Sequence, residues 1–273
     1  MFEVPQDASY LVDFSTGVLQ LTFNRPEQGN AVPTEAVPGM VKLLLAAQSN
    51  PAVRCILFAG NGPVFSAGGD LNAFARTLEQ DIASRQAEFA GRLAVVGSLV
   101  EAIAAFDRPI VTRVRGAAAA AGLLYVLAAD YAIGDETASM VFAHQRVGLS
   151  PDGGLSILLP QVVGTRTARA LMLTAARLDA AEAYRLGILN KIVGAAELDA
   201  EAAKIARRLA HAPQLATVST KRLINAAGHT PFSSQLTAEA EATVACTRHP
   251  DFAEGVQAFL GKRAAVFPST LIE

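Results

Sequence analysis

Short apolar segments alternate with segments of helical periodicity over the first two thirds of the chain. The apolar segments are bounded by glycine, proline and polar residues, and they have the length of strands. They cover residues 17–23, 53–59, 110–114, 130–134, 139–142 and part of 187–193. Helical segments cover residues 34–48, 88–106, 122–129, 156–163, 165–173 and 180–186, and a further helix begins at residue 71. This alternation predicts an α/β fold.

The pattern changes near Glu197, after which the chain is helical almost throughout. A change of this kind marks a candidate boundary between structural units. We therefore expect a core over residues 1–196 and a helical C-terminal region over residues 197–273.

The composition narrows the class of protein. Of the 273 residues, 51% are hydrophobic and 18% are charged, which is typical of a globular protein with a large core or interface. The net charge of −2 gives no reason to expect a nucleic-acid partner. Because no uninterrupted apolar run reaches the ~18 residues of a transmembrane helix, we expect no membrane span.

The cysteines and the first residues bear on location. Cys55 and Cys246 lie far apart and give no disulfide framework, which favours a reducing compartment. Cys55 falls in an apolar segment and is expected to be an inert core residue. Residues 1–10 lack the basic start and apolar run of a signal peptide. We therefore expect a cytoplasmic protein.

Residues 65–71 read Phe-Ser-Ala-Gly-Gly-Asp-Leu and join a buried strand to the start of a helix. Small residues at such a corner leave backbone N–H groups uncovered, and a helix N-terminus adds partial positive charge. The corner could therefore hold a negatively charged oxygen. Taken alone, the segment favours an ordinary tight turn.

Several segments resemble, in order, the motifs of the crotonase superfamily, which contains the enoyl-CoA hydratases and isomerases. They are residues 17–27 with Asn30 and Ala31, then 65–71, 107–116, 147–154 and 251–263. The resemblance covers nearly the whole chain. It implies a spiral of ββα turns that forms two sheets, with a helical C-terminal region that drives formation of homotrimers or of dimers of trimers.

The resemblance also implies an oxyanion hole made of two backbone N–H groups. The first donor falls on Gly69 and the second on Ala121, where the family usually has glycine. A backbone N–H does not require glycine, although the methyl group of Ala121 narrows the approach. The neighbouring Gly122 is an alternative donor.

The acid and base groups differ from those of the family's hydratases, which use two glutamates. The corresponding positions are Leu124 and His144, so a hydratase of the usual kind is disfavoured. Asp152 aligns with the lone carboxylate of family members that isomerise a double bond. Without the resemblance, the place of Asp152 after Pro151 favours a helix N-cap.

His144 has two interpretations. It could face the substrate as a weak acid, base or hydrogen-bond donor. More commonly, a histidine at the end of a strand is bonded to nearby backbone. We see no cluster of His, Cys and carboxylate residues with metal-ligand spacing, and we expect no metal.

The resemblance assigns the binding of coenzyme A to loops and to one residue near the C-terminus. Arg25 and the backbone at Ala31 match the turn that contacts the phosphates and pantetheine, and Ala67 with the adjacent Gly68 matches the segment beside adenine. Lys262 aligns with a lysine that contacts coenzyme A from a neighbouring subunit, although it could also be a solvated helix end. Coenzyme A is expected as part of the substrate, with no tightly bound cofactor.

Other residues near these motifs have simpler explanations as well. Asp70 is expected to cap the helix that begins after it. Phe74, Phe89 and Leu93 could line an acyl pocket or belong to the core.

The sequence favours a Δ3,Δ2-enoyl-CoA isomerase that uses Asp152 as base and acid. The alternatives are an enoyl-CoA hydratase with unusual acid and base residues, another enolate reaction such as hydrolysis, ring opening or C–C cleavage, and a non-catalytic protein that binds CoA thioesters. The acyl group is left open.

Overall fold

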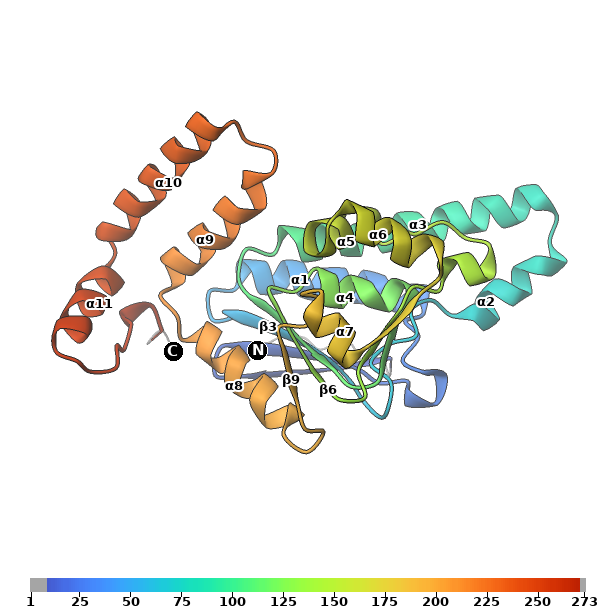
Figure 1. Ribbon diagram of the computed structural model, residues 1–273, viewed down its shortest axis with the longest axis horizontal. Helices are drawn as coiled ribbons and strands as arrows, with labels where there is room; N and C mark the ends of the chain where they lie inside the picture. The colour runs from blue at the N-terminus through green and yellow to red at the C-terminus, as the bar shows by residue number, and fades with distance from the viewer. Residues whose placement is uncertain (1–8, 271–273) are drawn as a thin grey trace.

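A six-stranded sheet forms the centre of the computed structural model, which describes residues 9–270 (Figure 1). Its strand order is β1-β2-β3-β4-β6-β9, with β1 antiparallel to β2 and all other neighbours parallel. These strands are β1 (Tyr10–Ser15), β2 (Val18–Phe23), β3 (Cys55–Gly60), β4 (Ile110–Val114), β6 (Tyr131–Asp135) and β9 (Lys191–Val193). A second, three-stranded sheet consists of β5 (Ala117–Ala119), β7 (Ser139–Val141) and β8 (Arg177–Asp179).

Helices cover both faces of the larger sheet. One face carries α1 (Val37–Ser49), α3 (Ile82–Ala105) and α4 (Leu123–Leu127), and α8 (Leu198–Ala210) packs on the other. The remaining helices of the core are α2 (Leu71–Arg76), α5 (Leu155–Val163), α6 (Thr165–Leu173) and α7 (Ala180–Arg185).

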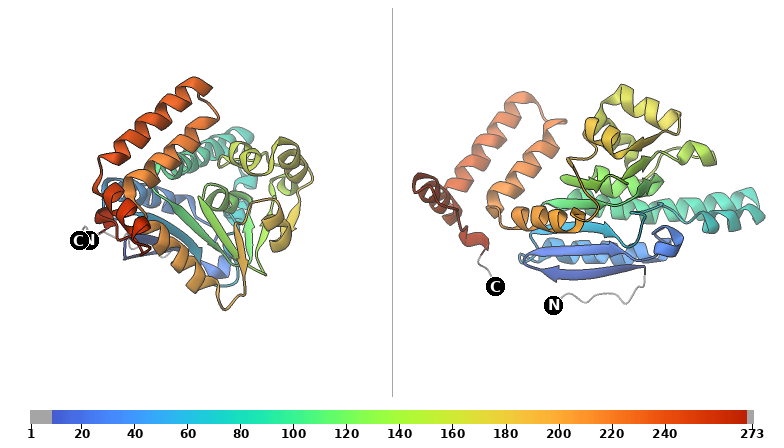
Figure 2. Two further views of the ribbon diagram at one scale, coloured as in Figure 1. Left: turned by 60° about the vertical axis from the view of Figure 1, so that its left-hand side comes forward. Right: turned by 60° about the horizontal axis from the view of Figure 1, so that its bottom comes forward.

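The last helices form an arm that extends away from the sheets (Figure 2). They are α9 (Gln214–Ala227), α10 (Phe232–Thr247) and α11 (Pro250–Leu260). Among residues 9–270, none of the helices has both the length and the apolar content that a membrane span requires. Most of the N-terminal stretch 1–10, which we expected to carry no signal peptide, lies outside the described residues.

Strand β3 shows why this sequence forms a central strand. All of its residues are buried, because helices cover both faces of the sheet. Ile56 and Phe58 pack into the core beneath α1 and α3, whereas Cys55 and Leu57 pack against α8. Burial raises the pKa of the Cys55 thiol, which therefore stays protonated and inert, as expected from the sequence.

The α/β fold and the strands and helices expected in the core are confirmed, with differences at several points. The helix expected over 88–106 begins earlier, at Ile82, where Asp81 accepts a hydrogen bond from Ser84 N–H at 2.9 Å. The strands β1, β5 and β8 were not expected. Helix α8 lies within the expected C-terminal region but packs on the sheet, and the division at residue 196 stays a prediction.

Arg108 ties the end of α1 to the central sheet. Its side chain is buried, and its guanidinium donates to the carbonyl oxygens of Ala47 (2.8 Å), Gln48 (2.6 Å), Asn50 (2.7 Å) and Val53. These carbonyls include groups that a helix end leaves without an intrahelical donor. One side chain thus supplies hydrogen-bond donors to the carbonyl groups of the turn between α1 and β3.

We predict that Arg108→Met lowers the free energy of unfolding by about 3 kcal/mol, because it leaves several buried carbonyl groups without a donor. The matched control is Arg208→Met on the exposed side of α8, with an expected change within about 0.5 kcal/mol. Urea denaturation of both variants measures the difference. Equal effects of the two substitutions would contradict the role of Arg108.

Candidate active site

Two loops lie side by side where the sheets meet. The Ser66 N–H donates to the Ala117 carbonyl at 3.1 Å, and the Ala119 N–H donates to the Ser66 carbonyl at 2.8 Å. Ser66 and Ala118 form a parallel bridge. The segment 65–71 is therefore paired with β5, which is formed by the first three residues of the alanine run 117–121.

Glycines allow the two loops to approach this closely. Gly68 has φ of +89°, and a Cβ there would lie 2.7 Å from the Ala119 oxygen and 2.8 Å from the Ala121 nitrogen. A Cβ on Gly116 would lie 1.9 Å from the Pro63 oxygen. A side chain at either position would separate the loops.

The two predicted donors lie on these loops. The Gly69 N–H has no hydrogen-bond acceptor among the described residues. Ala121 lies in the first turn of a 3-10 helix (Ala120–Gly122), where N–H groups lack intrahelical partners. Ala121 lines the cavity described below and Gly122 does not, since Gly122 packs against Ser66, where an added Cβ would lie 2.5 Å from the Ser66 oxygen.

A cavity of about 270 Å³ opens between these loops, α2, α3 and the segment before α5. The predicted residues Ala67, Gly68, Gly69, Ala121, His144 and Asp152 all line it. The structure thus brings together residues that lie far apart in the sequence. Leu124, at the position of a family glutamate, also lines the cavity and offers no acid or base.

His144 and Asp152 face each other in this cavity. The His144 Nε2 lies 3.2 Å from the Asp152 Oδ1. The His144 side chain is only 7% exposed and that of Asp152 is 34% exposed. The His144 Nδ1 is buried and has no partner among the described residues. The pair therefore joins a buried imidazole to a carboxylate that opens into the cavity.

The alternatives considered for this pair are not observed. Helix α5 has Gly154 as its N-cap and receives no side-chain cap, so Asp152 does not cap it. His144 lies in a 3-10 helix (His144–Val147) rather than on a strand end, and its Nε2 meets a carboxylate rather than backbone. Asp70 does cap a helix, since its Oδ1 accepts from the N–H groups of Asn72 and Ala73.

The turn over residues 25–31, which is expected to contact coenzyme A, is hydrogen-bonded to the segment 65–71. The Arg25 Nη1 donates to the Ala31 carbonyl at 3.1 Å, and the Ala67 N–H donates to the Gly29 carbonyl at 2.8 Å. Neither Arg25 nor Ala31 lines the cavity. Lys262 is exposed just after α11 and is also absent from the cavity lining.

Helices α2 and α3 supply the apolar part of the cavity. Phe74, Phe89 and Leu93 line it, and the rings of Phe74 and Phe89 lie 5.0 Å apart. A Cβ added to Gly69 would lie 3.1 Å from the Phe74 ring, which places that ring beside the first donor. Arg92 lines the same part and was missed, although its helical spacing from Phe89 would have placed it on this face.

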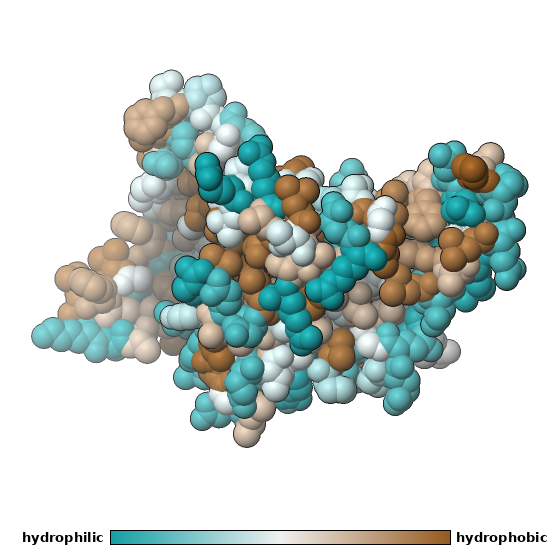
Figure 3. Space-filling view, turned by 45° about the vertical axis from the view of Figure 1, so that its right-hand side comes forward, coloured by the Kyte–Doolittle hydropathy of each residue, from teal (hydrophilic) through white to brown (hydrophobic). Residues whose placement is uncertain are grey.

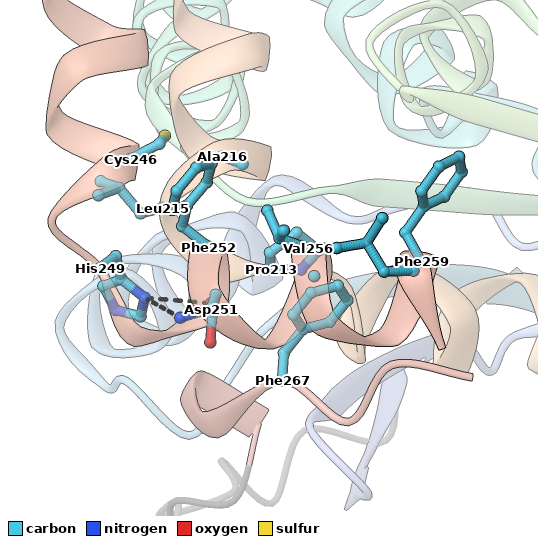
Figure 4. Close-up of a pocket in the computed structure, with 12 residues that line it drawn as sticks. Pro213, Leu215, Ala216, Cys246, His249, Asp251, Phe252, Val256, Phe259 and Phe267 are labelled. Atoms are coloured by element: carbon cyan, nitrogen blue, oxygen red, sulfur yellow. Dashed lines mark hydrogen bonds and ion pairs between the residues drawn. The ribbon is translucent and has the colours of Figure 1, made fainter. Parts of the chain in front are cut away.

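A second cavity, of about 500 Å³, lies among the arm helices (Figure 4). Its lining is mostly apolar, and its one carboxylate, Asp251, accepts hydrogen bonds from the Ser269 N–H (2.9 Å) and hydroxyl (2.6 Å) and lies 3.3 Å from the His249 Nδ1. The Asp251 carboxylate therefore binds the segment around Ser269, which follows α11. In residues 9–270 there is no group of three or more His, Cys, Asp or Glu side chains placed to hold a metal ion.

We predict that Gly68→Ala destabilises the fold by about 2–4 kcal/mol, because the methyl group meets backbone atoms and the positive φ is strained. The control is Gly91→Ala on exposed α3, where a Cβ meets nothing within 4 Å. That change is expected to stabilise by about 0.5–1 kcal/mol. Thermal unfolding tests both, and a neutral Gly68→Ala would refute the close approach of the loops.

The chain is similar to known proteins over almost its whole length. The model of the enoyl-CoA hydratase/isomerase family matches residues 13–270. The chain is 33% identical to 1,2-epoxyphenylacetyl-CoA isomerase of Escherichia coli (strain K12), over 92% of this chain and 95% of that protein. It is 30% identical to 4-chlorobenzoyl coenzyme A dehalogenase-2 of Arthrobacter sp, over 92% and 90% of the two chains.

Solved structures are similar to the same extent. The crystal structure of an enoyl-CoA hydratase from Polaromonas sp. JS666 matches with a TM-score of 0.86 and 32% identity. The match covers 94% of this chain and 98% of that chain. The shared fold therefore includes both sheets and extends into the helical arm.

Proposed function

Because the chain belongs to the enoyl-CoA hydratase/isomerase family, also called the crotonase superfamily, we propose that it is a Δ3,Δ2-enoyl-CoA isomerase. One observation carries the proposal: Asp152 opens into a cavity that Gly69 and Ala121 also line, whereas the other carboxylate in the lining, Asp70, is held as the cap of α2. The positions of the family's two glutamates hold Leu124 and His144.

The reaction needs two kinds of group. In the proposed step, the Asp152 carboxylate removes a proton from C2 of a 3-enoyl thioester. The electron pair moves through the double bond and the thioester carbonyl, so that negative charge develops on the thioester oxygen. The Gly69 and Ala121 N–H groups stabilise that charge, and one such donor typically contributes about 3–4 kcal/mol. Asp152 then returns the proton at C4, which leaves the double bond between C2 and C3.

His144 orients the carboxylate in this proposal. With its proton on Nε2, the imidazole donates to the Asp152 Oδ1, while Oδ2 has no protein partner among residues 9–270. Oδ2 is thereby the oxygen free to move the proton. His144 acts through Asp152 and is a positioning residue.

The arm supports a proposed oligomer. Phe232, Phe259 and Leu260 are 80%, 84% and 76% exposed on its helices, more than a stable monomer would leave to water. We propose that the arm packs on neighbouring subunits in a homotrimer or a dimer of trimers. Lys262, which follows α11, would then reach coenzyme A bound to a neighbour. The cytoplasmic location stays a prediction.

We predict that the purified protein converts a 3-enoyl-CoA into the conjugated 2-enoyl-CoA and that Asp152→Asn lowers this turnover by about 10²–10⁴-fold. Binding of a saturated acyl-CoA should persist in the variant. Thioester absorbance follows the reaction. The control variant, Glu136→Gln, should leave turnover unchanged, since Glu136 is an exposed carboxylate outside the cavity.

A parallel assay with a 2-enoyl-CoA separates the alternatives. Formation of a 3-hydroxyacyl-CoA from it would mean hydration and would contradict the single-carboxylate isomerase. Silence in both assays despite binding would favour a non-catalytic protein or a different acyl group. Full activity in Asp152→Asn would remove this carboxylate from the mechanism.

We predict that His144→Phe lowers kcat about tenfold with little change in KM, because it removes the donor to Asp152. His144→Gln keeps an N–H donor and should retain most of the activity. Steady-state kinetics of both variants give the comparison. Equal losses in the two variants would show that the imidazole itself transfers a proton.

A further inference from the structure

Arg92 places a cation in an otherwise apolar part of the cavity. The lining residues from α2 and α3 include Phe74, Phe89, Leu93 and Val96. Among the described lining residues, Arg92 is the sole lysine or arginine, and its side chain is 20% exposed. Figure 3 shows apolar side chains gathered at the projecting end of the molecule made by α2 and α3.

The guanidinium is held in place on one edge. Its Nε donates to the Glu88 Oε1 at 3.1 Å, and its Nη2 donates to the same oxygen. The other oxygen of Glu88 accepts from the Gln80 Nε2 at 2.8 Å. The guanidinium carbon lies 5.8 Å from the centre of the Phe74 ring. These contacts fix its orientation before any ligand binds.

The other edge of the guanidinium is unused. No hydrogen-bond acceptor for Nη1 occurs within residues 9–270. A purely hydrocarbon acyl group that filled this part of the cavity would remove water from Nη1 and supply no hydrogen-bond acceptor in its place. Leaving a charged donor dry and unpaired is costly, so the site disfavours such a group.

The charge of Arg92 is already balanced by Glu88. Hydrogen bonds from Gln80 and Arg92 lower the pKa of Glu88, which keeps its carboxylate ionised. A second carboxylate, on the substrate, would be repelled by Glu88. An uncharged oxygen can accept from Nη1 without this penalty.

We propose that Arg92 selects acyl groups that carry an uncharged oxygen acceptor, such as a hydroxyl or carbonyl, on the part distant from the thioester. The proposal rests on the proposed function only in placing the thioester at Gly69 and Ala121, which leaves the acyl end beside α3. The aromatic pair Phe74 and Phe89 makes a ring one suitable carrier of that oxygen, and an alkyl chain is the other.

The test compares ligands that differ by a hydroxyl in place of a methyl group. The pairs are para-hydroxyphenylacetyl-CoA with para-methylphenylacetyl-CoA, and ω-hydroxyhexanoyl-CoA with heptanoyl-CoA. Adipyl-CoA tests an acyl group with a charged end, and free CoA tests binding of the coenzyme A part alone. None of these thioesters has a non-aromatic double bond to isomerise, so calorimetric binding constants are independent of turnover.

We predict that the wild-type protein binds the hydroxyl member of at least one pair about tenfold more tightly than the methyl member, and more tightly than adipyl-CoA. Arg92→Met keeps similar volume without donors and should abolish this preference without weakening the methyl member. Arg76→Met, on exposed α2 outside the cavity lining, should leave the preference intact. So should Asp152→Asn, which separates this test from that of the isomerase.

Three results would overturn the proposal. The first is a wild-type protein with no hydroxyl preference in either pair. The second is an Arg92→Met variant that keeps the wild-type preference, which would make Arg92 a partner of Glu88 alone. The third is an Arg92→Met variant that loses affinity equally for every ligand, including free CoA. That result would mean that Arg92 binds the coenzyme A part of the ligand.

Discussion

The contact between residue 66 and residues 117–119 brings two backbone segments closer than side chains would permit. Gly68 and Gly116 are required at the contact, because a Cβ at either would meet a backbone atom at 2.7 Å or less. Everything in the site is placed relative to this contact. Gly69 and Ala121 line one cavity because their loops are paired, and Asp152 and His144 approach the same cavity from the segment before α5.

Much of this arrangement could be predicted from the sequence. The motifs place Gly69, Ala121, His144 and Asp152 near one another, and all four line one cavity. Strands with a strong apolar signature, such as β3, were also predicted, since burial on both faces leaves a continuous apolar run.

The rest depends on contacts between distant segments. Strand β5 consists of three alanines, which have no strand preference of their own, and it exists because β7 pairs with it. Strand β1 is an edge strand with mostly exposed residues, so it lacks a clean alternation. Arg92 gains its position from the packing of α2 on α3, where Glu88 fixes one edge of its guanidinium.

The central claim is that one carboxylate moves one proton between two carbons. The most direct measurement follows a deuterium label from C2 of a 3-enoyl-CoA during a single turnover in ordinary water. Part of the label is expected at C4 of the product, because the same Asp152 carboxyl group that removes the deuteron from C2 returns it at C4. A product that carries no label at C4 would contradict the return of the proton by a single group.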